Sequence, residues 1–294
     1  MNTELLRNYL ERASDRGLFN WLPDKYHLYL LYWARLGKWL NLKNPQTFNE
    51  KLQWLKLYNR KTEYTAMVDK YEAKKYIASV AGEEFVIPTL GVWDRFEDID
   101  FQDLPDQFVL KCTHDSGGFV ICRDKTKLDM TAVEEKIRKS LKTNYFFHGR
   151  EWPYKNVKPR ILAEAYVEDT ADDALTDYKF YCFNGTPQIM YISKDHGKEP
   201  FTDFFDMEFH HLPIIIQDPN AEVMPERPAQ FDQMKQFAAM LSRDIPFLRV
   251  DFYEVSGKLY IGELTFFDGS GFELVEPKEW NEKMGTWIRL PGHE

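Results

Sequence analysis

The sequence predicts an α+β protein, because helix signals are concentrated in its first part and hairpin signals in the remainder. Thr47 and Glu50 stand three residues apart at the start of an amphipathic segment, which is the capping-box pattern of a helix. Asn184-Gly185 separates two apolar runs, and this dipeptide is a strong hairpin signal. The 294-residue chain is 44% hydrophobic and 29% charged, a globular composition with room for one large or two medium domains.

The first 62 residues are predicted to form a helical region. Thr3 is placed to cap a first helix, a second runs through DKYHLYLLYWARLGKWL after Pro23, and a third follows Thr47. The second of these segments is aromatic and carries three basic residues, Lys25, Arg35 and Lys38. Such a helix packs on a protein core or lies on a membrane surface, and both possibilities stay open here.

Strands, hairpins and helices are all predicted in the remainder of the chain. A helix is predicted over DKYEAKKYIASVAG, from the capping pattern at Asp69 and Glu72 to Gly82. Strands are expected in FVIPTLGVW, QFVLKC, GFVICRD and RILAEAYVED, with a helix over about residues 131–145. DYKFYCFNGTPQIMYIS is the Asn-Gly hairpin. A helix near residues 228–242 precedes a second hairpin, RVDFYEVSGKLYIGELT, and PKEWNEKMGTWI is a closing helix.

The second hairpin carries charge in its strands, where charged residues are usually unfavourable. We expect a three-residue loop, residues 255–257, with Gly257 in the left-handed conformation that glycine tolerates. Glu254 then pairs with Lys258, and counting outward places Arg249 opposite Glu263.

This register also decides which side chains share a face. Asp251, Glu263 and Thr265 then lie on the face of Arg249, whereas a two-residue loop would put Asp251 and Glu263 on opposite faces. Two carboxylates on one face suit Mg²⁺, which is held by one or two carboxylates together with substrate phosphates. A simple Arg249–Glu263 pair beside a solvated aspartate explains the same charges.

Two further segments present charge from strands. Lys111 ends an apolar strand, and a loop with Gly117-Gly118 follows it directly. This is not a Walker A loop, but a glycine turn can offer N–H groups to phosphate beside a mobile lysine charge. A tight hairpin with a solvated lysine is the alternative. Asp177 and Lys179 likewise present charge to one strand face, as a solvent-facing strand also would.

Taken in order, these segments resemble the ATP-grasp superfamily. VLKCTHDSGG is similar to its strand lysine and flexible glycine loop, ILAEAYVED to its adenine-binding hinge, and RVDFYEVSGKLYIGELT to its metal-binding hairpin. More narrowly, TFNEKLQWLKLY, MVDKYEAKKY, GREWPYKNVKPRI and DYKFYCFNG resemble the TupA-like ATP-grasp family, which is associated with teichuronopeptide and other surface-polysaccharide synthesis. The resemblance implies an ATP-grasp fold of two α+β subdomains, built from residues 63–160 and 161–294 after the helical region 1–62.

The resemblance also implies roles for individual residues, with ATP and Mg²⁺ as cofactors. The residues implied to bind the nucleotide are Lys111, Gly117, Gly118, Glu164, Ala165, Tyr166, Val167, Asp177 and Lys179. Within this set the backbone of residues 165–167 lines the adenine pocket, and Asp177 orients Lys179 or reaches the ribose. Asp251, Glu263 and Thr265 are implied metal ligands, and the catalytic cations are Lys179 and Arg249, the latter at the transferring phosphoryl group. Thr265 stands where many ATP-grasp ligases have asparagine, so a water is the alternative third ligand.

The function implied is carboxylate–amine ligation through an acyl-phosphate, joining an amino acid or other amine to the carboxylate of a uronic acid or glycan. The alternatives are phosphate transfer to a sugar hydroxyl, a non-catalytic role in a polysaccharide assembly complex, or glycosyl transfer with Trp152, Tyr154 and Trp280 stacking on sugars. Peripheral contact with membrane-bound polysaccharide machinery is a further expectation.

Net charge and cysteine content limit the partners, the metal or disulfide sites and the cellular location that the sequence allows. The net charge of −9 argues against a nucleic-acid partner. Cys112, Cys122 and Cys182 have no CxxC spacing, which argues against a disulfide framework or a zinc site and favours the reducing cytoplasm. The amino-terminal segment is interrupted by charge and no apolar run approaches the roughly 20 residues of a membrane span, so a cytoplasmic location is expected.

Overall fold

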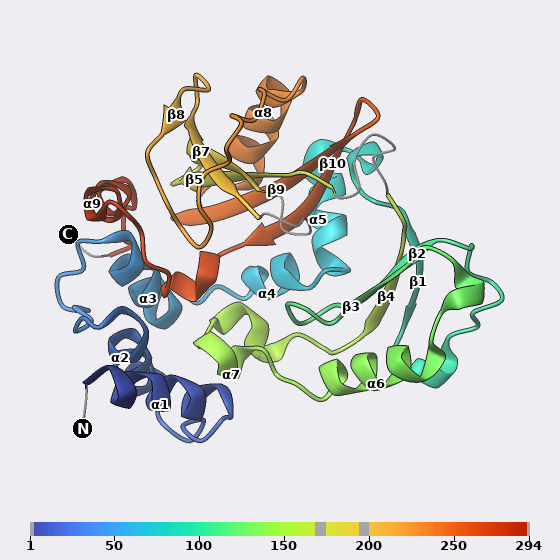
Figure 1. Cartoon of the computed structure of the whole chain (residues 1–294), viewed down its shortest axis with the longest axis horizontal. Coiled ribbons are helices and arrows are strands. Elements are labelled where there is room, and N and C mark those ends of the chain that lie inside the picture. Colours follow the sequence, from blue (N-terminus) through green and yellow to red (C-terminus); the bar gives the residue numbers. More distant parts are fainter. Residues whose placement is uncertain (1–2, 168–174, 194–199, 293–294) are drawn as a thin grey trace.

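Two antiparallel sheets and the helices around them form the protein (Figure 1). The computed structural model describes residues 3–167, 175–193 and 200–292. Both α-helices and antiparallel strands are present, and the helical region comes first, so the predicted α+β class is confirmed. Within the described residues, no helix has the length and apolar character needed to cross a membrane.

The amino-terminal region is helical, as expected. Its helices are α1 (Thr3–Asp15), α2 (Asp24–Leu36), α3 (Phe48–Tyr58), α4 (Glu63–Val68) and α5 (Glu72–Ala81). Thr47 accepts the backbone N–H of Glu50 while the Glu50 carboxylate accepts that of Thr47, so the capping box at α3 is confirmed. Gly37 ends α2 with a φ of 68°, a left-handed conformation that glycine adopts without strain.

The first sheet has the strand order β1-β4-β2-β3 in the described part of the chain. Its strands are β1 (Thr89–Trp93), β2 (Phe108–Cys112), β3 (Phe119–Cys122) and β4 (Ile161–Ala165). Helix α6 (Met130–Leu141) packs on β2 and β3, and α7 (Phe146–Gly149) leads into the 3-10 helix η4 (Trp152–Asn156). A separate apolar core lies under this sheet, with Phe108, Leu110 and Ile137 fully buried.

The second sheet has the order β10-β9-β5-β6-β7-β8 among the described residues. Its strands are β5 (Asp177–Phe183), β6 (Thr186–Ser193), β7 (Thr202–Asp206), β8 (His211–Leu212), β9 (Phe247–Val255) and β10 (Lys258–Thr265). Helix α8 (Phe231–Leu241) covers β5, β6 and β9, and α9 (Lys278–Trp287) packs on α3. Asn184 and Gly185 both have positive φ, so the predicted two-residue hairpin turn is confirmed.

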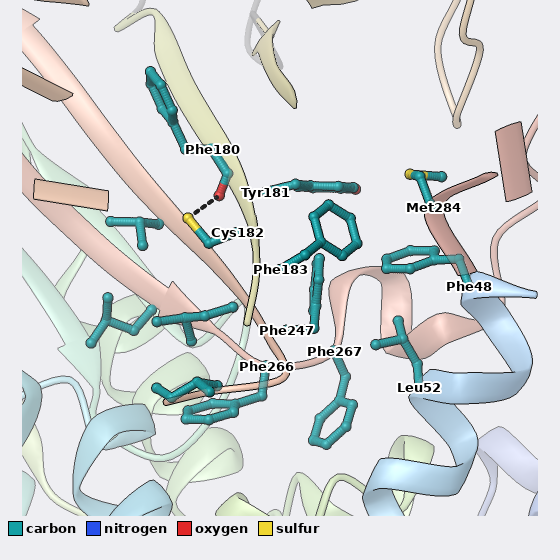
Figure 2. Close-up of a cluster of buried hydrophobic side chains, with 14 of the residues drawn as sticks. Phe48, Leu52, Phe180, Tyr181, Cys182, Phe183, Phe247, Phe266, Phe267 and Met284 are labelled. Atoms are coloured by element: carbon teal, nitrogen blue, oxygen red, sulfur yellow. Dashed lines mark hydrogen bonds between the residues drawn. The ribbon is translucent and has the colours of Figure 1, made fainter. Parts of the chain in front are cut away.

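An aromatic core ties the amino-terminal helices to the second sheet. Figure 2 shows Phe48 of α3 facing the rings of Phe183 and Phe247, and the ring centroids of Phe48 and Phe247 are 4.9 Å apart. Leu28 and Leu31 of α2 belong to the same buried cluster. Aromatic pairs of this kind add roughly 0.5–1.5 kcal/mol beyond their burial. The helical region therefore shares the main core.

The β9–β10 hairpin closes through a two-residue loop, so the expected three-residue loop is wrong. Val255 pairs with Lys258, and Ser256 and Gly257 have φ values of 50° and 76°, as a type I′ turn requires. The right-handed twist of the flanking strands matches this turn, which is why short hairpins favour it.

A β-bulge at Gly262 nevertheless places the charged residues of the hairpin on one face, as predicted. The ladder shifts by one residue there, so Glu263 lies opposite Asp251 and Thr265 lies opposite Arg249. The expected register, with Arg249 directly opposite Glu263, is therefore wrong, while the common face of the charged residues is right.

Candidate functional site

One row of charged residues crosses three strands of the second sheet. Lys179 of β5 pairs with Asp251 of β9, which pairs in turn with Glu263 of β10. Side chains of directly paired residues lie together on one face. Lys179 Nζ lies 3.7 Å from Asp177 Oδ2 and 3.3 Å from Ser193 Oγ. The fold thus brings together residues from two separate sequence motifs.

Arg249 lies in the neighbouring row, between Tyr181 and Thr265. Its Nε and Nη2 donate to both oxygens of Asp251, at 2.7 and 2.6 Å, and its Nη1 donates to Asp268. The Tyr181 hydroxyl donates to the other oxygen of Asp268. These carboxylates raise the pKa of Arg249 well above its ordinary value, although burial opposes the shift. The guanidinium is therefore a fixed, permanent charge.

A cavity of about 340 Å³ opens beside these rows. Glu263, Thr265, Arg249 and Lys179 contribute to its wall from the sheet, and Ser116 contributes from the glycine loop. The remaining lining residues come from α2, from the segment around α7 and η4, from β6 and β7, from the segment after β8, and from the turn after β10. They are Arg35, Tyr145, His148, Glu151, Tyr154, Tyr191, Ser193, Thr202, Gln217, Phe267, Asp268, Gly269, Ser270 and Glu273.

Carboxylates are crowded around this cavity. Burial raises the pKa of Asp251 to about 6 against the attraction of Arg249. Burial and then the charge of Asp268 raise the pKa of Glu273 to about 7. Glu263 differs: burial opposes the shift, but the charges of Lys70 and Arg249 lower its pKa. Of these three carboxylates, Glu263 is therefore the one whose surroundings favour the ionised form.

A second ionic cluster lies on the first sheet. Lys111 Nζ is 2.6 Å from Glu164 Oε2, and Lys74 Nζ is 2.7 Å from Glu164 Oε1. Burial alone would raise the pKa of Glu164, but the two lysines lower it to about 2. In the described residues, the cavity lining does not include Lys111 or Glu164. The two predicted nucleotide-binding groups are therefore together, but outside that cavity.

The glycine loop lies between β2 and β3, as expected. Gly117 has a φ of 99°, and a side chain at Gly118 would collide with Asp115 and Ser140. Lys70 Nζ donates to the backbone carbonyl of Asp115 and lies 3.7 Å from Glu263 Oε1. Lys70 therefore connects the glycine loop to the metal-binding face predicted on the hairpin.

The predicted hinge motif, residues 161–169, begins with β4 and continues past its end. The backbone N–H of Ala165 donates to the Pro88 carbonyl, and the Tyr166 hydroxyl accepts Nε of Arg123 at 2.9 Å. Val167 is the last described residue before the gap, and positions 168–169 of the hinge motif lie outside the described residues.

Several residues of the site were not predicted from the sequence. Lys74 occupies a helix position that looks like an ordinary solvated lysine, and Asp268 and Glu273 follow the second hairpin in an irregular segment. The run Asp268-Gly-Ser-Gly is a turn signal that predicts irregular backbone, but no local pattern predicts contact with Arg249.

Mg²⁺ is implied by the resemblance, and the donor set fits it. Glu263 is one-third exposed at the cavity, and its cationic partners, Lys70 and Arg249, lie 3.7 and 3.8 Å away. Asp251 and Thr265 share its face. No group of three or more His, Cys, Asp or Glu residues in the described chain forms a ready-made metal site. Mg²⁺ fits such a place, because it binds one or two carboxylates and completes its shell with water and substrate phosphates.

The two sheets, the glycine loop, the strand lysine and the acidic hairpin define an ATP-grasp protein. Residues 50–289 match the family described as TupA-like ATPgrasp, and the chain belongs to that family. The resemblance seen in the sequence is thereby confirmed. No curated protein matches the chain.

Solved structures with a similar arrangement include several ligases. D-alanine–D-alanine ligase from Helicobacter pylori is 15% identical, with a TM-score of 0.48 over 82% of this chain and 69% of that one. The Bacillus anthracis enzyme complexed with ATP is 18% identical, with a TM-score of 0.40 over 68% of this chain and 54% of that one. N5-carboxyaminoimidazole ribonucleotide synthetase, as an ADP complex, is 15% identical, with a TM-score of 0.40 over 74% and 50%. The chain spans about half the length of the Bacillus anthracis ligase.

Proposed function

We propose that the protein is an ATP- and Mg²⁺-dependent ligase that joins a carboxylate to an amine. One observation carries the proposal: Lys179, Asp251 and Glu263 form a single row, with Arg249 beside it, and the row borders a 340 Å³ cavity. Lys179, Arg249 and Glu263 line the cavity, and Asp251 lies between Lys179 and Glu263 in the sheet. This arrangement suits phosphoryl transfer, in which positioning and charge stabilisation provide most of the catalysis.

The residues divide into two groups in this proposal. Lys111 and the glycine loop hold the ATP phosphates, and residues 164–167 line the adenine. Lys74 and Lys111 are both held by Glu164, so the carboxylate keeps them in place before nucleotide binds. Lysine is a mobile point charge that suits phosphate contact.

The phosphoryl group transfers beside the second sheet. Lys179 and Arg249 stabilise the charge on that group, and Arg249 is held in one orientation by Asp251 and Asp268. Asp251, Glu263 and Thr265 would hold Mg²⁺, which supplies Lewis-acid stabilisation of phosphate oxygens when bound.

The substrates that we propose are a uronic acid or other glycan carboxylate and an amino acid or other amine. Tyr145, Tyr154 and Tyr191 line the cavity together with hydroxyl and amide groups, and such mixed aromatic and polar surfaces suit sugars. The family's association with surface polysaccharides supports the same class. A role in polysaccharide synthesis, a cytoplasmic location and contact with membrane-bound machinery belong to the proposal, and the three buried free cysteines agree with a reducing compartment.

A phosphate-release screen tests the proposal. Uronic acids and glycan carboxylates are paired with amino acids in the presence of ATP and Mg²⁺, and phosphate and ADP are measured. The ligase predicts release of both that depends on the carboxylate and the amine. A stable phospho-sugar would instead establish a phosphotransferase, and absence of Mg²⁺-dependent nucleotide binding in calorimetry would establish a non-catalytic protein.

A further inference from the structure

Glu151 is a buried carboxylate for which the functional assignments above have no use. It lies in the GREWPY segment, directly before η4, and its residue is only 3% exposed. The side chain lines the cavity, and its Oε1 accepts the hydroxyl of Ser270. Within the described part of the chain, Oε2 has no hydrogen-bond or ion-pair partner. A buried anion with one unused oxygen is costly unless a cation joins it.

Lys56 lies behind Glu151 and does not fill this role. Its Nζ donates to Gln53 Oε1 at 2.9 Å and to the carbonyls of Gly149 and Ser270, both at 2.7 Å. Lys56 is fully buried, and it has no carboxylate within 4 Å among the described residues. It therefore fixes two backbone segments beside Glu151, at Gly149 and Ser270, and leaves Oε2 of this cavity-lining residue without a cationic partner in the described chain.

The backbone around Ser270 is held in an unusual conformation. Gly269, Ser270 and Gly271 have φ values of 52°, 53° and 63°, and left-handed backbone at a serine is uncommon. The Ser270 hydroxyl reaches Glu151, while its carbonyl accepts Lys56. Strain of this kind persists where surrounding contacts determine it, often at functional sites.

Burial and several charged groups act on the Glu151 carboxyl. The titratable groups that face it are Lys56 from α3, Glu263 from β10, Asp268 from the turn after β10, and the phenols of Tyr145 and Tyr154. Burial raises the pKa of Glu151 to about 7, against the attraction of Lys56. Burial lowers the pKa of Lys56 to about 7 as well. A group with such a pKa exchanges protons readily at neutral pH.

We propose that Oε2 of Glu151 binds the ammonium group of the amine donor and accepts one of its protons. This inference rests on the ligase function proposed above. The ammonium gives one proton to Glu151 and becomes a neutral amine, whose nitrogen attacks the carbonyl carbon of the acyl-phosphate. The C–N bond forms, the C–O bond to phosphate breaks, and the phosphate leaves with that electron pair and the second amine proton. Glu151 then returns its proton to water.

Ethylammonium is the probe for the test, because it carries the ammonium group without a further functional group. The full chain is labelled with ¹³C at the glutamate side-chain carboxyl, and the Glu151 resonance is assigned by its absence from Glu151→Gln. It is titrated between about pH 5 and 9 in ethylammonium chloride and in sodium chloride of equal ionic strength. We expect a midpoint near neutrality that falls by about one unit with ethylammonium, or roughly tenfold preference for the carboxylate form.

The controls separate this inference from the ligase proposal. Glu97→Gln, on the surface beside Arg138, leaves the Glu151 midpoint and its response unchanged. If Glu151→Gln does not fold, Glu151→Asp provides the assignment. A midpoint that ethylammonium leaves unmoved overturns the Glu151 assignment while ATP binding by the same sample persists. If the wild-type chain does not bind ATP, the ligase proposal is overturned instead.

A kinetic measurement tests the proton transfer itself. Hydroxylamine is a neutral nucleophile at pH 7 and needs no base, so it traps an acyl-phosphate as a hydroxamate. With the carboxylate found in the screen, Glu151→Gln is expected to form hydroxamate at the wild-type rate and to lose amine-dependent phosphate release. Equal loss of both reactions, or retention of both, contradicts the role of Glu151 as proton acceptor.

Discussion

Glu263 lies directly opposite Asp251 across the β9–β10 pair, because Gly262 adds one residue to β10 between the turn and the site. A two-residue turn alone would point these carboxylates to opposite faces of the sheet. The bulge therefore decides whether the hairpin presents a pair of carboxylates or a single one. Bulges occur often beside active sites, where they redirect a side chain.

Gly262 is expected to resist substitution. A β-carbon there would collide with the ring of Tyr253, so Gly262→Ala is expected to cost about 1–3 kcal/mol of unfolding free energy through overpacking. Urea unfolding measures the change. Lys258→Ala, on the exposed end of the same strand, is the matched control and is expected to change stability by roughly 0.5 kcal/mol or less. Equal stability of the two variants would show that the ring moves aside freely.

Lys111 is expected to contribute to ATP binding more than to stability. Glu164 keeps its second partner, Lys74, when Lys111→Ala removes the first, so the buried carboxylate stays paired. Loss of one charge-assisted phosphate contact is expected to cost about 1.5–3 kcal/mol, or about ten- to a hundredfold in the dissociation constant. Calorimetric titration with ATP measures it. A wild-type dissociation constant would remove Lys111 from the nucleotide site.

The amino-terminal helical region contributes one residue, Arg35, to the cavity lining in the described chain. Arg35 reaches the wall from α2, outside the family match, while pairing with Glu11 and Asp15 of α1. Arg35→Ala is expected to raise KM for an acidic acceptor by about tenfold, near 1.4 kcal/mol, and to leave ATP binding unchanged. Arg12→Ala, on the exposed face of α1, is the control. An unchanged KM, or weaker ATP binding, would contradict this assignment.

The burial of His27 between α1 and α2 is expected to make the stability of the protein depend on pH. The His27 ring lies 3.1 Å from the Ser14 hydroxyl and is fully buried, and burial followed by the charge of Arg150 lowers the pKa of His27 to about 4. Between about pH 6.5 and 4 the unfolded chain binds a proton that the folded chain does not, so stability falls as pH falls. The loss attributable to this histidine is on the order of 3 kcal/mol.

The measurement is the difference between two proteins. Urea unfolding of the wild type and of His27→Gln is followed across this pH window, so that carboxylates common to both cancel. The wild type is expected to lose more stability than the variant on acidification. Parallel pH dependence would show that His27 is protonated in the folded protein.

Much of the order of elements was predictable, because local signals determine it, although α4, β7 and β8 were not predicted. The capping box at Thr47, the stop at Gly82 and the turn at Asn184-Gly185 each depend on a few neighbouring residues. The common face of Asp251 and Glu263 was also predicted, but for the wrong reason. The expected three-residue loop is a two-residue loop, and the bulge at Gly262 shifts the register by the one residue that the loop lacks. A glycine within a strand is a bulge signal, so the position of Gly262 could have suggested this register.

Contacts between distant segments were not predictable. No local pattern shows that Lys179 pairs with Asp251, because that depends on β5 lying beside β9. The contacts of Asp268 and Glu151 depend in the same way on irregular segments, whose backbone is decided by surrounding packing. The nucleotide, metal and catalytic roles of the predicted residues, and the division at residues 62 and 160, remain predictions.

Glu263 tests the central claim more cleanly than Asp251 does. Asp251→Ala would leave Arg249 buried without its bidentate partner, and breaking such a pair typically costs about 3–5 kcal/mol. Glu263 is one-third exposed with partners beyond 3.5 Å, so Glu263→Ala is expected to cost roughly 0–1 kcal/mol. Loss of activity in that variant therefore reports on chemistry and not on folding.

The decisive measurement is Mg²⁺-dependent phosphate release by Glu263→Ala, beside its melting temperature and with Glu254→Ala of the same hairpin as control. We predict that release falls to background in Glu263→Ala while the melting temperature stays near that of the wild type, and that Glu254→Ala keeps wild-type activity. Substantial Mg²⁺-dependent release by Glu263→Ala would contradict the account of the β9–β10 hairpin as the metal site.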